Sequence, residues 1–266
     1  MIASVTHVEL DGGEASATIS PADGGRLTSL RVRGRELIDS SIAHRADPLH
    51  WGSYPMAPWV GRTRRGRFAF AGVDYQLPIN MEPHAIHGTT FTKSWRVVEE
   101  GSLALEIETE LSDPDCGDWP FGGIARQQFE LEPDALTCWL EVEAVEAMPA
   151  EIGWHPWFVK PDSVEFTAGV MFGRDDDYIC DGRTVSPPPP PPWDDNFTEV
   201  TQPVNLRWGD LTVSITSSCE YWVVYDMPEH ATCVEPQSGP ANSLNLGPTV
   251  LQAGDRLRHW MRIAWS

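Results

Sequence analysis

The feature that most constrains the fold is the alternation of apolar and polar residues along much of the chain. Successive side chains of a β-strand point to opposite faces, so an apolar residue at every second position predicts a strand with one buried face. The pattern is clear in Phe68, Phe70, Val73, Tyr75 and Leu77, in Leu103, Leu105, Ile107 and Leu111, and in Phe129–Leu131 followed by Trp139–Val145. Further strand-like stretches are Val5–Leu10, Ala15–Ile19, Leu27–Val32, Val164–Thr167, Leu211–Ile215, Tyr221–Tyr225 and His259–Trp265.

Helical patterns are missing from the sequence. No window of about eleven residues combines a 3.6-residue apolar period with helix caps. We therefore expect an all-β fold, a large antiparallel β-sandwich that forms a single domain over residues 1–266. The run Pro187–Pro192 is a stiff polyproline II stretch, which we interpret as a loop within that domain rather than as a linker.

Charge and cysteine content restrict the partners. The formal net charge of −20 creates a field that repels nucleic acids and anionic membranes, so neither is an expected partner. The five cysteines, Cys116, Cys138, Cys180, Cys219 and Cys233, are odd in number and widely spaced, which favours free thiols. With no signal segment or long apolar run, a soluble cytoplasmic protein, monomer or homodimer, is expected.

Three short segments stand out as candidates for chemistry. They are His84–Gly88, Gly153–Phe158 and Cys233–Pro240. His155 lies between Trp154 and Trp157, where it could be either a buried core histidine or a functional group. Glu235 follows an apolar strand that Pro236 is expected to end, where it could be either a base with a raised pKa or the cap of a turn.

A metal centre is the weaker interpretation of the same residues. His84 and His87 with His155 and Glu235 would make a zinc set, but the spacing lacks any established zinc motif, so no metal and no cofactor are expected. Residues three apart on a strand also point to opposite faces, so only one of the two histidines should enter a pocket.

Taken together and in order, these segments resemble the aldose 1-epimerase (galactose mutarotase) family. The resemblance begins at Pro21–Leu27, continues through Tyr54–Arg62, Gly66–Phe68 and His84–Gly88, and includes Gly153–Phe158, Asp194–Phe197 and the segment around Glu235. It implies a galactose mutarotase-like supersandwich and an enzyme that interconverts the α and β anomers of a hexose. Gly61 and Thr89 depart from the pattern of well-studied members, which leaves the preferred sugar open.

The resemblance also implies roles for individual residues. Glu235 corresponds to the general base and His155 to the general acid, while His87, Arg62 and Asp194 correspond to groups that bind the sugar. Asp195 is the less favoured alternative to Asp194. Trp154, with Trp193 as the alternative, is expected to stack on the sugar's apolar face.

Such a reaction needs one base at the C1 hydroxyl and one acid at the ring oxygen, each contributing typically 10²–10⁴-fold. We expect Glu235 and an imidazolium at His155 to reach opposite flanks of one sugar-sized cleft. Three alternatives remain. They are a hexose-6-phosphate mutarotase that uses Arg64, Arg65 or Arg67, a non-catalytic carbohydrate-binding β-sandwich, and a glycosidase with Asp194 and Glu235 as its carboxylates.

Overall fold

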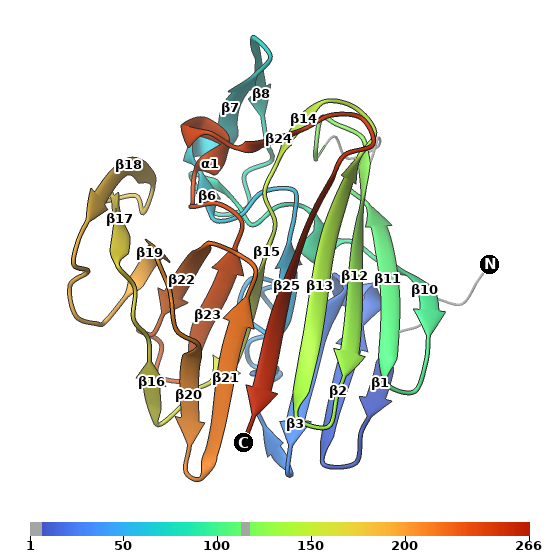
Figure 1. The fold of residues 1–266 in the computed structure, drawn as a ribbon. Coiled ribbons are helices and arrows are strands. Elements are labelled where there is room, and N and C mark those ends of the chain that lie inside the picture. Colours follow the sequence, from blue (N-terminus) through green and yellow to red (C-terminus); the bar gives the residue numbers. More distant parts are fainter. Residues whose placement is uncertain (1–6, 113–117) are drawn as a thin grey trace.

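Two large antiparallel sheets make up most of the computed structural model, which describes residues 7–112 and 118–266 (Figure 1). The first sheet has the order β1 (Val8–Asp11), β2 (Ala15–Ser20), β3 (Arg26–Val32), β5 (Ser53–Met56), β15 (Gly153–Val159), β23 (Ala231–Gln237), β22 (Tyr221–Tyr225), β19 (Asp194–Thr198), β17 (Val170–Arg174) and β18 (Cys180–Val185). In addition, β4 (Arg35–Glu36) pairs with β3.

The second sheet has the order β10 (Arg96–Glu100), β11 (Ala104–Glu110), β12 (Gly123–Leu131), β13 (Ala135–Ala144), β25 (Arg256–Trp265), β21 (Leu211–Ser217), β20 (Val204–Trp208) and β16 (Ser163–Glu165). Three small pairs join β14 (Met148–Ala150) to β24 (Thr249–Leu251), β6 (Arg62–Thr63) to β9 (Ala85–Ile86), and β7 (Arg67–Phe70) to β8 (Val73–Gln76). The helical segments are short: α1 (Ser243–Leu246) and 3-10 turns at Pro21–Asp23, Arg64–Gly66 and Thr90–Thr92.

The hydrophobic core joins the two sheets. Ile19 and Leu30 from the first sheet belong to the same buried cluster as Leu140 and Ile215 from the second. Along β12, buried and partly exposed positions alternate strictly over most of the strand, which is the pattern that the sequence predicts for one packed face. The prediction of an all-β, large antiparallel β-sandwich is confirmed.

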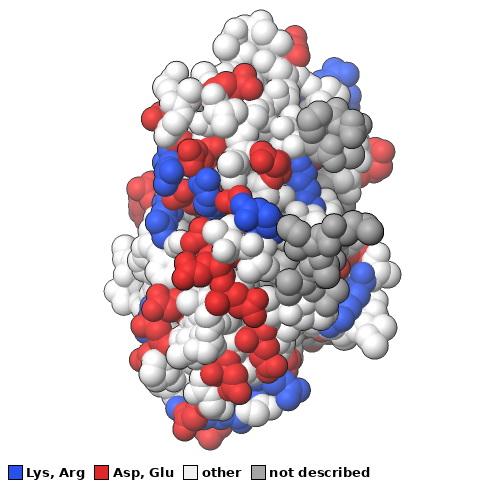
Figure 2. All heavy atoms as spheres, turned by 90° about the vertical axis from the view of Figure 1, so that its right-hand side faces the viewer, with Lys and Arg blue, Asp and Glu red and all other residues white. Residues whose placement is uncertain are grey.

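Acidic side chains gather on the flank of the molecule where the edge strand β10 lies, as Figure 2 shows. Several are paired with arginine: Glu108 contacts both Arg96 and Arg126, and Arg126 also contacts Glu143 at 2.7 Å. Within the described residues, no helix is both long and apolar enough to cross a bilayer.

The proline run connects β18 to β19, which belong to the same sheet. Immediately after it, the Trp193 indole packs against Phe166 and Phe197 and donates a hydrogen bond to the carbonyl oxygen of Pro189. The run is therefore a loop between two strands of one sheet.

The four described cysteines, Cys138, Cys180, Cys219 and Cys233, are buried free thiols, and Cys116 lies outside the described residues. Burial raises the pKa of the Cys138 thiol far above its ordinary range. A buried thiol with a raised pKa is poorly reactive because the thiolate is the nucleophile.

A fully buried cation, Arg26, anchors the start of β3. Its guanidinium donates to the carbonyl oxygens of Trp51 and Pro48, the latter at 2.8 Å, and lies 4.2 Å from the centre of the Trp51 ring. On its other side it lies 4.7 Å from the Tyr54 ring. Burial lowers the pKa of Arg26 to about 10, so it stays protonated at neutral pH. Loop carbonyls that would otherwise be buried without partners are thereby satisfied.

Replacing this buried cation with an apolar side chain of similar length should destabilise the protein. We expect Arg26→Met to lower the free energy of unfolding by about 3–5 kcal/mol, because several buried carbonyls lose their donor. Arg31→Met on the same strand is the matched control, since Arg31 is exposed and pairs only at the surface with Glu36. Equal losses for both variants in urea unfolding would contradict the anchoring role.

Candidate active site

The centre of the first sheet brings two distant segments together. Strands β15 and β23 are antiparallel, with Gly153 opposite Gln237 and Trp157 opposite Cys233. The same register places His155 opposite Glu235. Directly opposed residues on one face of an antiparallel pair are in contact range, and Nε2 of His155 lies 3.2 Å from Oε1 of Glu235.

Strand β23 runs through Pro236 to Gln237, which corrects the expectation that Pro236 ends the strand. The pairing with β15 is interrupted here, between the Gly153–Gln237 pair and the Trp157–Cys233 pair, so Pro236 lies at a break in that ladder, where a missing donor is tolerated. Glu235 is consequently held within a central strand rather than at its rim. Its position is fixed by neighbours on both sides, since Val223 of β22 faces it from the other edge.

Alternation along β15 decides which of its aromatic residues reach the cavity. His155 and Trp157 point to the cavity face and line it, whereas Trp154 points to the opposite face, where it is 1% exposed within the core. The sequence prediction that Trp154 stacks on a sugar is therefore wrong. Trp193, the alternative, packs against Phe166 and Phe197, and Trp157 is the tryptophan that lines this cavity.

A cavity of about 130 Å³ opens beside this pair of strands. Its lining residues come from segments that are far apart in the sequence. The principal lining residues are His50, Tyr54, Arg62, His87, His155, Trp157, Arg174, Tyr178, Asp194, Asn196, Tyr225, Glu235 and Gln237. A concave site with aromatic walls and a few convergent polar groups is typical of a small-molecule binding site.

Burial shifts the pKa values of the two central groups, Glu235 and His155, in opposite directions. Desolvation, with Asp194 nearby, raises the pKa of Glu235 well above its ordinary value, although the amide of Gln237 donates to its Oε2 at 3.0 Å. Desolvation lowers the pKa of His155 to about 3. The neutral forms of both groups are favoured, which corrects the expectation of a standing imidazolium at His155.

Planar groups stack continuously through His155. The Tyr54 ring lies 4.8 Å from the His155 ring on one side, and the Trp157 ring lies 5.3 Å away on the other. Trp157 in turn is nearly parallel to His230, at 5.9 Å, and His230 lies 4.2 Å from His44. The imidazole of His155 is thus clamped between two aromatic faces, so its ring plane is fixed.

Two predicted sugar-binding residues lie at the small β6–β9 pair, where Arg62 begins β6 and His87 directly follows β9. Arg62 and His87 both line the cavity, and the His87 ring lies 4.9 Å from that of His155. His87 has a φ of +61°, a left-handed conformation, and its amide donates to the carbonyl of Gly61 at 3.1 Å. A side chain on the following residue, Gly88, would come within 2.0 Å of the Ala57 carbonyl oxygen. This tight turn directs the imidazole of His87 into the cavity, where burial lowers its pKa well below the ordinary value.

His84 lies outside the cavity lining, so the four-residue zinc set considered from the sequence is not assembled. Its Nδ1 accepts a hydrogen bond from the backbone amide of Arg65 at 3.0 Å, and its Nε2 lies 3.9 Å from Asp177. Arg64, Arg65 and Arg67 are also outside the lining.

Alternation along β19 separates the two candidate aspartates. Asp194 faces the cavity, and burial raises its pKa while Arg62 and Arg174 oppose that shift. Asp195 is buried on the other side of the strand and accepts a hydrogen bond from Nε of Arg174 at 2.5 Å. Of the two, Asp194 has the side chain that a bound molecule could reach.

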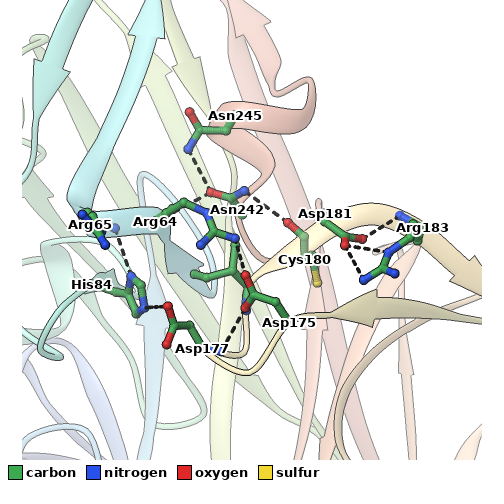
Figure 3. Close-up of polar contacts among 11 residues, drawn as sticks. Arg64, Arg65, His84, Asp175, Asp177, Cys180, Asp181, Arg183, Asn242 and Asn245 are labelled. Carbon is green, nitrogen blue, oxygen red and sulfur yellow. Dashed lines mark hydrogen bonds and ion pairs between the residues drawn. The ribbon is translucent and has the colours of Figure 1, made fainter.

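The turn between β17 and β18 forms an outer wall of the cavity. Figure 3 shows that this turn is tied to the β6–β9 region by an ion pair between Arg64 and Asp175 and by the contact of His84 with Asp177. Tyr178 follows these contacts with a φ of +61°, and its ring lies 4.0 Å from the guanidinium carbon of Arg174 and 5.0 Å from that of Arg62.

Several lining residues were not identified from the sequence. Trp157 and Gln237 lie two positions from His155 and Glu235 on the same strands, so alternation could have found them. Arg174 and Tyr178 belong to an irregular hairpin with a register shift, and no periodic pattern marks them. His50 lies in a turn-rich segment and gave no signal either.

Comparisons with known proteins show which family the chain belongs to. The family model described as aldose 1-epimerase matches residues 6–170, more than half of the chain. The uncharacterized Escherichia coli (strain K12) proteins YphB and YihR are 32% and 30% identical over 40% and 56% of this chain. Those matches cover 36% of YphB and 49% of YihR, so the chain spans at most about half the length of these relatives.

Solved structures show the same fold. A galactose mutarotase-like protein from Clostridium acetobutylicum superposes with a TM-score of 0.84 at 17% identity, covering 98% of this chain and 95% of that one. The galactose 1-epimerase of Lactobacillus acidophilus NCFM gives 0.80 at 15% identity, covering 98% and 94%. The chain therefore belongs to the aldose 1-epimerase family.

Burial of His155 predicts a stability that depends on pH. The folded protein binds a proton at His155 only near pH 3, whereas the unfolded chain binds it near the ordinary histidine value of 6.5. Between these values the unfolded state holds more protons, so stability falls as the pH is lowered. At pH 4.5 this group should account for about 2–3 kcal/mol.

Unfolding free energies at pH 7 and pH 4.5 test this expectation. His155→Gln should lose less stability on acidification than the wild type, while the exposed control His7→Gln should match the wild type. An unchanged pH dependence in His155→Gln would show that His155 does not titrate as described.

Proposed function

We propose that the protein is an aldose 1-epimerase that interconverts the α and β anomers of a free hexose by general acid–base catalysis. The observation that carries the proposal is the cross-strand contact of His155 with Glu235, 3.2 Å apart on the floor of the cavity. The two oxygens that exchange protons in ring opening, the C1 hydroxyl and the ring oxygen, are bonded to the same carbon. A base and an acid that lie side by side suit such a pair of oxygens better than groups on opposite flanks.

One proton shared between Glu235 and His155 allows the pair to act both as the base and as the acid. Moving the proton of a neutral Glu235 to His155 leaves a carboxylate next to an imidazolium, so the pair as a whole stays neutral. Glu235 then takes the proton of the C1 hydroxyl while His155 gives its proton to the ring oxygen, and the C1–O5 bond breaks to leave the open-chain aldehyde. Both groups are then neutral again, the state that burial favours.

Ring closure completes the exchange. Rotation about the C1–C2 bond presents the other face of the carbonyl, and the same two proton transfers in reverse form the opposite anomer. Gln237 orients the Glu235 carboxyl through the 3.0 Å hydrogen bond, and the faces of Tyr54 and Trp157 fix the ring of His155. Neither a metal nor a cofactor is needed for these steps.

The remaining lining groups fit the binding of a neutral sugar. His87 would donate to the ring oxygen or a neighbouring hydroxyl, and Arg62 with Asp194 would fix the orientation of other hydroxyls. Trp157, which stacks with both His155 and His230, adds to the aromatic wall of the cavity. The phosphorylated-hexose alternative has less support, because its expected cations, Arg64, Arg65 and Arg67, lie outside the cavity lining. A non-catalytic binding site would have no need for the buried proton-sharing pair.

Removing the base should abolish catalysis without abolishing binding. We expect Glu235→Gln to lower kcat/KM for the mutarotation of α-glucose or α-galactose by about 10²–10⁴-fold. Polarimetry measures the rate against the spontaneous reaction, and calorimetry measures sugar binding. The matched control is Glu141→Gln, a buried carboxylate on β13 outside the cavity.

The test first requires that the wild-type protein accelerates mutarotation. A wild-type protein that binds the sugars but leaves the spontaneous rate unchanged would be a carbohydrate-binding module instead. Retained activity in Glu235→Gln would remove Glu235 from the mechanism.

The shared proton also predicts the pH profile. The pair must hold one proton, so activity should fall only where a second proton is added, near the His155 value of about 3, or where the shared one is lost, above the ordinary range of a glutamate. We expect kcat/KM, corrected for the spontaneous rate, not to fall as the pH is lowered through 6.5, the ordinary histidine value. A tenfold loss between pH 7 and pH 5.5 in a protein that stays folded by circular dichroism would contradict the neutral resting pair.

A further inference from the structure

We propose that Asp39, His44 and His230 bind a divalent metal ion of the zinc class at the rim of the cavity, separately from the acid–base pair. One ligand atom of each residue lies within 4.8 Å of the others. Oδ2 of Asp39 lies 2.6 Å from Nδ1 of His44 and 3.8 Å from Nε2 of His230. Ligand atoms on a tetrahedral zinc ion, each about 2.1 Å from the metal, lie roughly 3.4 Å apart, which is between these two distances.

The backbone already holds two of the three ligands in place. The amide of Asp39 donates to the Trp157 carbonyl at 2.8 Å, and the amide of Lys160 donates to the His230 carbonyl at 2.9 Å. Both ligand segments are therefore attached to the end of the central strand β15. His44 is held by a turn, since its amide donates to the carbonyl of Ser41 at 3.0 Å. Only small movements of the side chains are needed to enclose an ion.

The donor set fits an ion that prefers imidazole nitrogen together with one carboxylate. Three protein ligands leave a fourth position for water, as in zinc sites that exchange a ligand. The net charge of −20 also favours the approach of a cation.

An ordinary hydrogen bond explains only part of this arrangement. A bond between His44 and Asp39 accounts for the 2.6 Å contact, but it does not require a second imidazole 4.2 Å from the first and directed at the same carboxylate oxygen. A bound ion gives all three groups one common partner. It would also hold His230 in its parallel stack on Trp157, a wall of the cavity.

The test is a titration of the full chain, free of any histidine tag, with ZnCl₂ and with CoCl₂ by calorimetry and absorption spectroscopy. We expect one zinc ion per chain, and at least about tenfold weaker binding in His44→Ala and in His230→Ala. His7→Ala and His259→Ala are matched controls for the loss of a histidine elsewhere, and should bind as the wild type does. Circular dichroism checks that each variant is folded.

The cobalt spectrum distinguishes this site from the other group of possible metal ligands, His155, Cys233 and Glu235, because only that group contains a thiol. Cobalt bound by Asp39, His44 and His230 should show weak visible bands without the strong near-ultraviolet band of a cobalt thiolate. A thiolate band, or binding that His44→Ala and His230→Ala leave unchanged, would overturn the proposal. Absence of zinc binding at 100 µM would overturn it too, and none of these results depends on whether the protein catalyses mutarotation.

Discussion

The antiparallel pairing of β15 with β23 is the constraint on which the rest of the candidate site depends. It joins two segments about 80 residues apart in the chain and sets His155 against Glu235 on one face of the sheet. Because the pairing is central, with β5 and β22 on either side, neither residue can move without disturbing four strands. Slippage of either strand by one residue would turn its own member of the pair into the core.

Support for this pair extends through the aromatic stack. Arg26, buried beneath Tyr54, satisfies loop carbonyls and holds the ring that packs on His155. On the other side Trp157 and His230 continue the stack to the surface, where Asp39 and His44 gather. The buried imidazole of His155, clamped in this way, contacts Glu235 at 3.2 Å and lines the cavity. The same burial makes the pair neutral at rest.

Much of the fold could be predicted from the sequence, because alternation is local information. The strands and the sandwich follow from it, and so does the side-chain direction that places Trp154 in the core rather than in the cavity. The family resemblance supplied Glu235, His155, His87, Arg62 and Asp194, all of which line one cavity. Sequence reasoning could not supply the pKa shifts, since these depend on burial, or the contributions of His50, Arg174 and Tyr178, which come from irregular segments.

The β17–β18 hairpin stands at the edge of its sheet, joined to β19 at only two register positions. It nevertheless supplies Arg174 and Tyr178 to the cavity wall, whereas His155 and Glu235 come from the central strands of the sheet. Insertions or substitutions in such a peripheral hairpin leave the central ladder intact. Evolution could therefore alter what this cavity admits through the hairpin alone, while the central pairing of His155 with Glu235 is inherited unchanged on a separate part of the chain.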